Sequence, residues 1–105
     1  MPRSDRLDLV FRALGDKTRR ALLARLRRGP AMITELAAPF DLSLPAVSRH
    51  VKVLERARMI RRTVDGRVHR CEIDGEVLRI VDQWLDPYRR FWDETLESLA
   101  RYAER

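Results

Sequence analysis

The sequence has one cysteine, Cys71, and no long apolar run among its 105 residues. A single cysteine excludes an internal disulfide and cannot form a metal-ligand cluster alone. No apolar segment approaches the roughly 20 residues of a membrane span, and residues 1–8 are too polar for a signal-peptide core. A hydrophobic content of 45% and a charged content of 36% are typical of a globular chain. We therefore expect one cytoplasmic domain, residues 1–105, without membrane contact.

The common catalytic patterns are also missing. No nucleophile–base pair, glycine-rich phosphate loop or pair of inward-facing carboxylates can be assembled from the sequence. We expect a protein that is not an enzyme and that needs no cofactor.

Positive charge is concentrated in the middle of the chain. The net charge is +6, and the segment Ser43–Cys71 holds eight basic and two acidic residues. From Glu72 onward the balance reverses, with nine acidic and five basic residues. This distribution favours a polyanion-binding face followed by a segment with another role. A mosaic of solvated charges is the alternative, and the pattern of secondary structure has to separate the two.

The periodicity of apolar residues predicts a mainly α-helical fold with one β-hairpin. Asp16 and Ser43 are placed to cap helices, and Asp65-Gly66 favours a tight type I′ turn. Pro87 interrupts the last helical segment at Asp86-Pro87, so two helices joined there are an open possibility. The expected elements are helices over 7–14, 17–28, 32–38 and 43–57, strands over 59–64 and 67–73, and helical structure from Gly75 to the end.

The helix expected over 43–57 has the properties of a DNA-recognition helix. At 100° per residue, Val47, Val51 and Leu54 form a narrow apolar seam. Arginine can read guanine in the major groove, serine can contact bases or phosphate, and lysine neutralises phosphate. Together with the preceding short helix and turn, it predicts a helix-turn-helix over residues 32–57. The opposite face of the helix carries Pro45, Ser48, Arg49, Lys52 and Arg56.

The hairpin over residues 59–73 is also basic. Arg61, Arg62, Arg67 and Arg70 surround its tip. Arginine at such a tip can enter an adjacent minor groove, whose negative potential attracts it. An ordinary edge hairpin protected by charges is the alternative. Beside a basic recognition helix we favour the first interpretation, a winged helix-turn-helix.

Four stretches of this sequence resemble the ArsR family of bacterial winged-helix repressors. The resemblance covers nearly the whole chain and implies a dimer whose first and last helices, 1–14 and 75–105, form the interface. It further implies that Ser43, Ser48, Arg49 and Lys52 line the DNA-facing helix and that Arg67 lies in the wing. The matching stretches are LGDKTRR at 14–20, TELA at 34–37, SLPAVSRHVKVL at 43–54 and Gly66-Arg67.

The sequence departs from the metal-sensing members of that family. Met32-Ile33-Thr34 stands where arsenic- and cadmium-type members carry Cys-Val-Cys, and no histidine follows His69 to form a zinc site on the last helix. These metals require thiolate or imidazole ligands. We expect neither metal site, a small buried hydrophobe at Cys71 and a packing or phosphate-contact role for His50.

The last helical segment carries more apolar surface than a small domain can cover. A stripe from Val77 to Tyr102 predicts a dimer interface, with the first helix as its partner. An aromatic ligand pocket made by Trp84, Tyr88 and Trp92 is the alternative. The residues expected at the interface are Leu7, Val10, Phe11, Trp84, Tyr88, Phe91, Trp92 and Leu99.

Together with the resemblance to a family of repressors, these patterns predict a repressor that binds double-stranded DNA as a homodimer at a palindromic operator. A winged helix used as a protein-interaction module is the second possibility. The basic recognition face argues against it, because a protein-docking surface would present exposed apolar anchors there.

Overall fold

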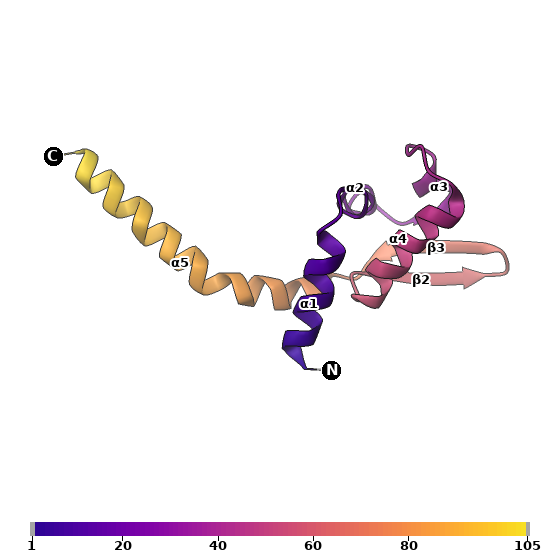
Figure 1. Ribbon diagram of the computed structural model, residues 1–105, viewed down its shortest axis with the longest axis horizontal. Helices are drawn as coiled ribbons and strands as arrows, with labels where there is room; N and C mark the ends of the chain where they lie inside the picture. Colours follow the sequence, from indigo (N-terminus) through magenta and orange to yellow (C-terminus); the bar gives the residue numbers. More distant parts are fainter. Residues whose placement is uncertain (1, 105) are drawn as a thin grey trace.

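The computed structural model describes residues 2–104, so the outer ends of the expected domain, Met1 and Arg105, lie outside the described residues. The fold is mainly α-helical with a small antiparallel sheet and a long C-terminal helix, as predicted (Figure 1). Its elements are α1 (Arg3–Leu14), α2 (Lys17–Leu26), β1 (Ala31–Met32), α3 (Ile33–Ala37), α4 (Leu44–Arg56), β2 (Ile60–Asp65), β3 (Val68–Ile73), the 3₁₀ turn η1 (Gly75–Val77) and α5 (Leu78–Ala103).

Two predicted helix caps are confirmed. The Asp16 carboxylate accepts the Arg19 backbone N–H at 3.0 Å at the start of α2. The Ser43 hydroxyl accepts the Ala46 backbone N–H at 3.3 Å at the start of α4, and Pro45 lies in the first turn. Each acceptor satisfies one of the N–H groups that a helix start leaves unpaired.

The other helix boundaries differ by a few residues from those expected. Helix α1 begins at Arg3 rather than near Leu7, because its first turn is polar and gives no apolar period to follow. Helix α2 ends at Leu26 rather than Arg28. The chain then turns through Gly29, whose φ of +143° only glycine adopts readily.

The sheet has three strands in the order β1-β3-β2, not the two of the predicted hairpin. Ala31 pairs with Cys71 and Met32 with Arg70, so these two residues are extended and α3 begins one residue later than predicted. By pairing with β3, strand β1 connects the start of the helix-turn-helix to the wing. A two-residue strand is too short for alternation to reveal it in the sequence.

The hairpin turn lies one residue further along than predicted. Asp65 pairs with Val68, so Gly66 and Arg67 are the two central residues. Gly66 has a φ of +61°, and among the described residues Arg58 is the only non-glycine with positive φ. Positive φ at the first central residue only is the geometry of a type II′ turn. The predicted type I′ turn needs positive φ at both central residues. The shift places Arg67 at the tip of the wing.

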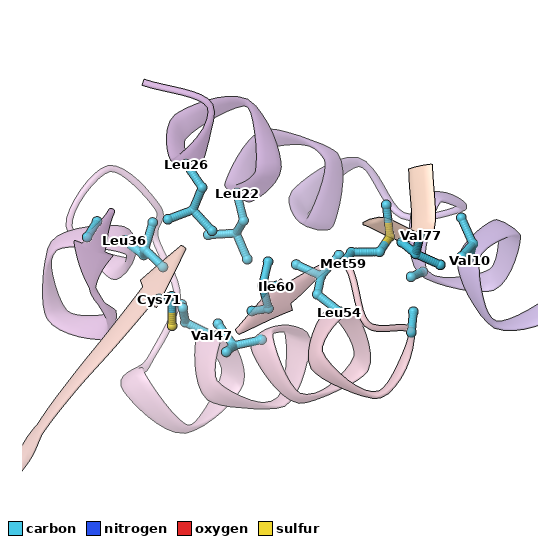
Figure 2. Close-up of a cluster of buried hydrophobic side chains, with 14 of the residues drawn as sticks. Val10, Leu22, Leu26, Leu36, Val47, Leu54, Met59, Ile60, Cys71 and Val77 are labelled. Carbon is cyan, nitrogen blue, oxygen red and sulfur yellow. The ribbon is translucent and has the colours of Figure 1, made fainter. Parts of the chain in front are cut away.

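The core collects side chains from all the elements around α4 (Figure 2). Val47, Val51 and Leu54 have no exposed surface, which confirms the apolar seam of α4. Cys71 is also fully buried, as expected of a small hydrophobe. Val10 was expected at the dimer interface, and this was wrong: its side chain is fully buried within its own chain and can touch no partner.

Helix α5 is assigned as one helix through Pro87, so the predicted interruption does not divide it. Its axis changes direction partway along, and its C-terminal part projects away from the other elements (Figure 1). Proline lacks the N–H of an internal helical hydrogen bond and crowds the preceding turn, which bends a helix without ending it. This projection gives the molecule its extents of 65 × 32 × 20 Å. No helix between residues 2 and 104 is long and apolar enough to cross a membrane.

Candidate nucleic-acid interface

Helix α4 presents a polar and basic face to solvent. Its buried seam fixes the rotation of the helix, so the side chains on the other side must point outward. Ser48 is partly exposed, and four further side chains expected to contact DNA are exposed. These four are Pro45, Arg49, Lys52 and Arg56.

The cations on this surface are not neutralised by the protein itself. Between residues 2 and 104, no carboxylate forms an ion pair with Arg49, Lys52, Arg56 or Arg67. Unpaired cations on one face create the positive potential that attracts a phosphate backbone. The charge excess seen in the sequence is therefore available on the surface of α4 and the wing.

The structure brings the N-terminal half of α4 and the wing tip together. Pro45 and Ser48 of α4 line one side of a cavity of about 450 Å³, and Arg67 and Val68 of the wing line the other. Arg56 lies 11 residues after Pro45, or about 16 Å along the helix, and does not line this cavity. Of the side chains predicted to contact DNA, Ser48 of α4 and Arg67 of the wing tip therefore border the same cavity.

Arg62 does not belong to this exposed set. Its side chain is only 11% exposed, and its Nη2 donates to Glu55 Oε1 at 3.1 Å. Its Nη1 lies 3.3 Å from His69 Nδ1. Arg62 therefore joins the wing to α4, and we withdraw it as an expected DNA contact. The net positive charge around it could not reveal that one arginine of the wing faces inward.

Two basic groups of α2 also have structural roles that the sequence did not reveal. Arg19 Nε donates to the Ala13 carbonyl at 2.7 Å, and its Nη2 donates to the Arg12 carbonyl at 3.0 Å. Its Nη1 lies 3.3 Å from His50 Nδ1 on α4. Arg20 donates to the Leu14 carbonyl at 2.7 Å. These arginines satisfy carbonyls at the end of α1, and Arg19 fixes α4 to it.

The fold shifts the pKa values of two titratable side chains, Asp16 and Cys71. The Arg19 backbone N–H lowers the pKa of Asp16, and the charges of His50 and Arg19 act in the same direction. Burial raises the pKa of the Cys71 thiol, against a smaller opposite effect of Arg62. A buried thiol with a raised pKa is a poor nucleophile. Among the described residues, no three His, Cys, Asp or Glu side chains gather as a metal site would need.

The second candidate surface is the apolar face shared by α1 and α5. The rings of Phe11 and Trp84 meet edge to face with centroids 5.2 Å apart, and Tyr88 lies 5.0 Å from Trp84. Beyond them the face is bare: Phe91 and Trp92 are each 61% exposed. A cavity of about 410 Å³ is lined by Leu7, Trp84 and Tyr88 but not by Trp92. The three aromatic residues of the alternative ligand pocket therefore do not line one cavity.

Comparison with known proteins identifies the family. Residues 14–63 match a family model described as a helix-turn-helix domain. The chain is 38% identical over 97 residues to the HTH-type transcriptional regulator Rv2034 of Mycobacterium tuberculosis, covering 92% of this chain and 88% of that protein. It is 30% identical to the transcriptional repressor SdpR of Bacillus subtilis, over 72% of this chain and 84% of that protein.

Solved structures agree with this result. The structure of the ArsR family transcriptional regulator RHA00566 superimposes with a TM-score of 0.80 at 43% identity, covering 86% of this chain and 93% of that one. The fold also matches that of Mb0332 from Mycobacterium bovis, a winged helix-turn-helix domain described as homodimeric, with a TM-score of 0.65, 21% identity and coverage of 89% and 83%. The chain belongs to the ArsR family of helix-turn-helix transcriptional regulators, and it is not an enzyme.

Proposed function

We propose that this regulator is a cytoplasmic homodimeric repressor that binds a palindromic operator. The observation that supports it most is the unpaired basic face of α4, whose Ser48 borders the same cavity as Arg67 of the wing tip. Repression is proposed from the similarity to SdpR, which is a transcriptional repressor. The alternative of a protein-interaction module has less support, because the outer face of α4 offers unpaired cations.

In this proposal α4 enters the major groove with its N-terminal half leading. Arg49 reads a guanine edge, and Ser48 contacts a neighbouring base or phosphate. Lys52 and Arg56 neutralise phosphates. Ser43 caps the helix, so its contribution is to orient the N-terminal N–H groups of α4, which favour phosphate. Arg67 at the wing tip enters the adjacent minor groove.

The apolar face of α1 and α5 provides the dimer interface. No residue of α5 is buried within the chain, although the helix carries a continuous stripe of large apolar side chains. A monomer rarely leaves a contiguous apolar face of this length in water. A second copy related by a two-fold axis covers the same face on both chains.

Selection from fragmented genomic DNA with the purified protein tests this function. The selected sites should share an imperfect palindrome with half-sites about one helical turn, ~34–36 Å, apart. Affinity for such a site should fall by ~10³ or more between 50 and 200 mM salt if the dimer neutralises about six to ten phosphates. A flat salt response without enrichment of any sequence would favour the protein-interaction module instead.

A further inference from the structure

A third cavity lies on α1, the end of α4 and the beginning of α5, and its walls are rich in arginine. Its volume is about 450 Å³. Arg6 of α1, Arg56 and Arg58 at the end of α4, and Arg79 of α5 line it. Neither Arg49 nor the wing tip borders this cavity, so it adjoins the proposed DNA-contacting face of α4 only at the C-terminal end of the helix, at Arg56.

The carboxylates in its wall do not balance these cations. Glu76 pairs with Arg79 at 2.9 Å, and Asp74 accepts the Glu76 backbone N–H at 3.1 Å as the cap of η1. Across residues 2–104, neither an ion pair nor a side-chain hydrogen bond is formed by the other three guanidinium groups, those of Arg6, Arg56 and Arg58. Three positive groups therefore border one cavity without an acceptor.

Arg6 shows the consequence most directly. Its Nε is buried and has no hydrogen-bond partner. A buried donor without a partner is unfavourable, and native proteins leave few of them. Because this Nε has no surface open to the cavity, an oxyanion there would meet the terminal nitrogens of the Arg6 guanidinium group, which bind carboxylate and phosphate through paired hydrogen bonds.

Arg58 occupies a position where the backbone favours glycine. Its φ is +59°, and the Met59 N–H returns to the Leu54 carbonyl at 3.0 Å, as in a Schellman ending of α4. Glycine would adopt this conformation without the steric cost of a Cβ. The turn itself gives no reason for an arginine, whereas an anion in the adjacent cavity does.

Apart from the polar Gln83, the rest of the wall is apolar and is formed by Leu9, Ala57, Val77 and Ile80. We propose that this cavity binds a small organic anion, a carboxylate or phosphate ester whose apolar body packs on these apolar side chains. The guanidinium groups of Arg6 and Arg58 hold its charged end. Inorganic phosphate lacks the apolar body, and a neutral aromatic compound lacks the charge, so each should bind less well than a molecule with both.

Occupancy of the cavity would be communicated to DNA. The cavity joins the end of α4 to α1 and α5, so a ligand that bridges them favours one orientation of α4 relative to the dimer elements. It also adds negative charge beside α4. Both effects should weaken operator binding, and this regulatory step rests on the dimeric DNA-binding function proposed above.

Calorimetric titration of the full chain in phosphate-free buffer tests the site without DNA. The probes are phenyl phosphate and benzoate, with inorganic phosphate and phenol as the charged and apolar parts alone. One of the two complete anions should bind saturably, at least tenfold tighter than either part.

Two variants test the arginines. Arg58→Gly relieves the positive φ and Arg6→Met removes the unpaired Nε, so neither should lower the melting temperature. Both should weaken binding of the anion at least tenfold. Arg101→Ala, in the last turn of α5, is the matched control and should leave binding unchanged.

Three outcomes would overturn the proposal. The first is no saturable binding of phenyl phosphate or benzoate up to about 10 mM, which is about tenfold above a millimolar Kd. The second is equal binding by wild type and Arg58→Gly. The third is a loss of DNA affinity in Arg58→Gly without any anion, which would make the cluster a DNA-backbone contact. Saturating anion should lower operator affinity of wild type at least threefold and leave that of Arg58→Gly unchanged. Failure of wild type to bind DNA at all would refute the proposed function and leave the calorimetric result standing.

Discussion

Single arginines in this chain divide into those that hold the fold together and those that face outward unpaired. Arg19 and Arg62 are bonded to carbonyls, a histidine or a carboxylate. Arg49 and Arg67 are exposed and form no ion pair within residues 2–104. The sequence gives the same letter to both groups. Only the direction of each side chain, which depends on tertiary packing, separates them, so the basic segment predicted the surface but not its members.

The exposed, unpaired Arg49 leads to a prediction about which side chain reads a base. Arg49→Ala should cost ~1–3 kcal/mol on the selected operator and relax the preference at one base pair per half-site, because a bidentate contact to guanine is lost. Lys52→Ala should weaken operator and random DNA about equally, since a phosphate contact carries no sequence information. Fluorescence anisotropy on both DNAs measures this. Equal losses on both DNAs for both variants would mean that Arg49 reads no base.

Asp16 provides a prediction about stability and pH. Asp16→Ala should lower the free energy of unfolding by ~1 kcal/mol at pH 7, because the cap of α2 is lost. The pKa of Asp16 is lowered in the folded chain, so the charged carboxylate stabilises the fold above about pH 4, and this part is lost as the pH falls through the lowered pKa. Denaturant titration of wild type and Asp16→Ala at pH 7 and again below the lowered pKa of Asp16 measures both effects.

The matched control for this cap is Asp16→Asn, which keeps an acceptor and removes the charge. Its stability should lie between those of wild type and Asp16→Ala at pH 7 and should vary less with pH than that of wild type. A deficit of Asp16→Ala that stays constant down to pH 2.5, about 1.4 units below the usual carboxyl pKa, would show that the charge of Asp16 contributes nothing.

At the scale of elements, long amphipathic helices were predictable and short or irregular pieces were not. Helix α4 begins at its predicted cap and buries its predicted seam, since 13 residues with a clear apolar period leave little choice. Strand β1 has two residues and exists only because β3 pairs with it. The turn of the wing shifted by one residue because the choice between types I′ and II′ depends on the register of β2 and β3.

Pro87 inside α5 should reduce the stability of the fold and bend the helix. A proline inside a helix costs about 3 kcal/mol against alanine. Pro87→Ala should therefore raise the free energy of unfolding, by ~1–3 kcal/mol, and straighten α5. Circular dichroism melts at fixed protein concentration measure it, with the neighbouring exposed Asp86→Ala as a control expected to stay within about 0.5 kcal/mol. An unchanged Pro87→Ala would mean that packing on α1, not the proline, sets the bend.

At the scale of the whole molecule, the sequence indicated an interface that a single chain cannot complete. The start of the apolar stripe predicted from Val77 to Tyr102 packs within its own chain: Val77 is buried, Val81 packs against the core, and Trp84 contacts Phe11. From Tyr88 to Tyr102 its large apolar side chains are exposed. The prediction of Val10 as an interface residue was wrong because one side of α1 packs against its own domain and only the other side is exposed. The period of α1 gives its apolar residues but cannot say which of them the chain covers itself.

Dimerisation should therefore be required for specific DNA binding, and Phe91→Glu should separate the two chains. Phe91 is 61% exposed, and a carboxylate buried there without a partner would strongly disfavour association. Ala100 lies nine residues further along α5, on the opposite face at 100° per residue, so Ala100→Glu adds the same charge to the solvent side and should remain dimeric. Each Phe91→Glu monomer would keep one α4 and half of the contacts, so operator affinity should collapse while weak binding to random DNA persists. Sedimentation velocity beside a binding assay measures both properties. A wild-type monomer that binds its operator tightly, or a Phe91→Glu variant that stays dimeric, would show that α5 does not form the interface.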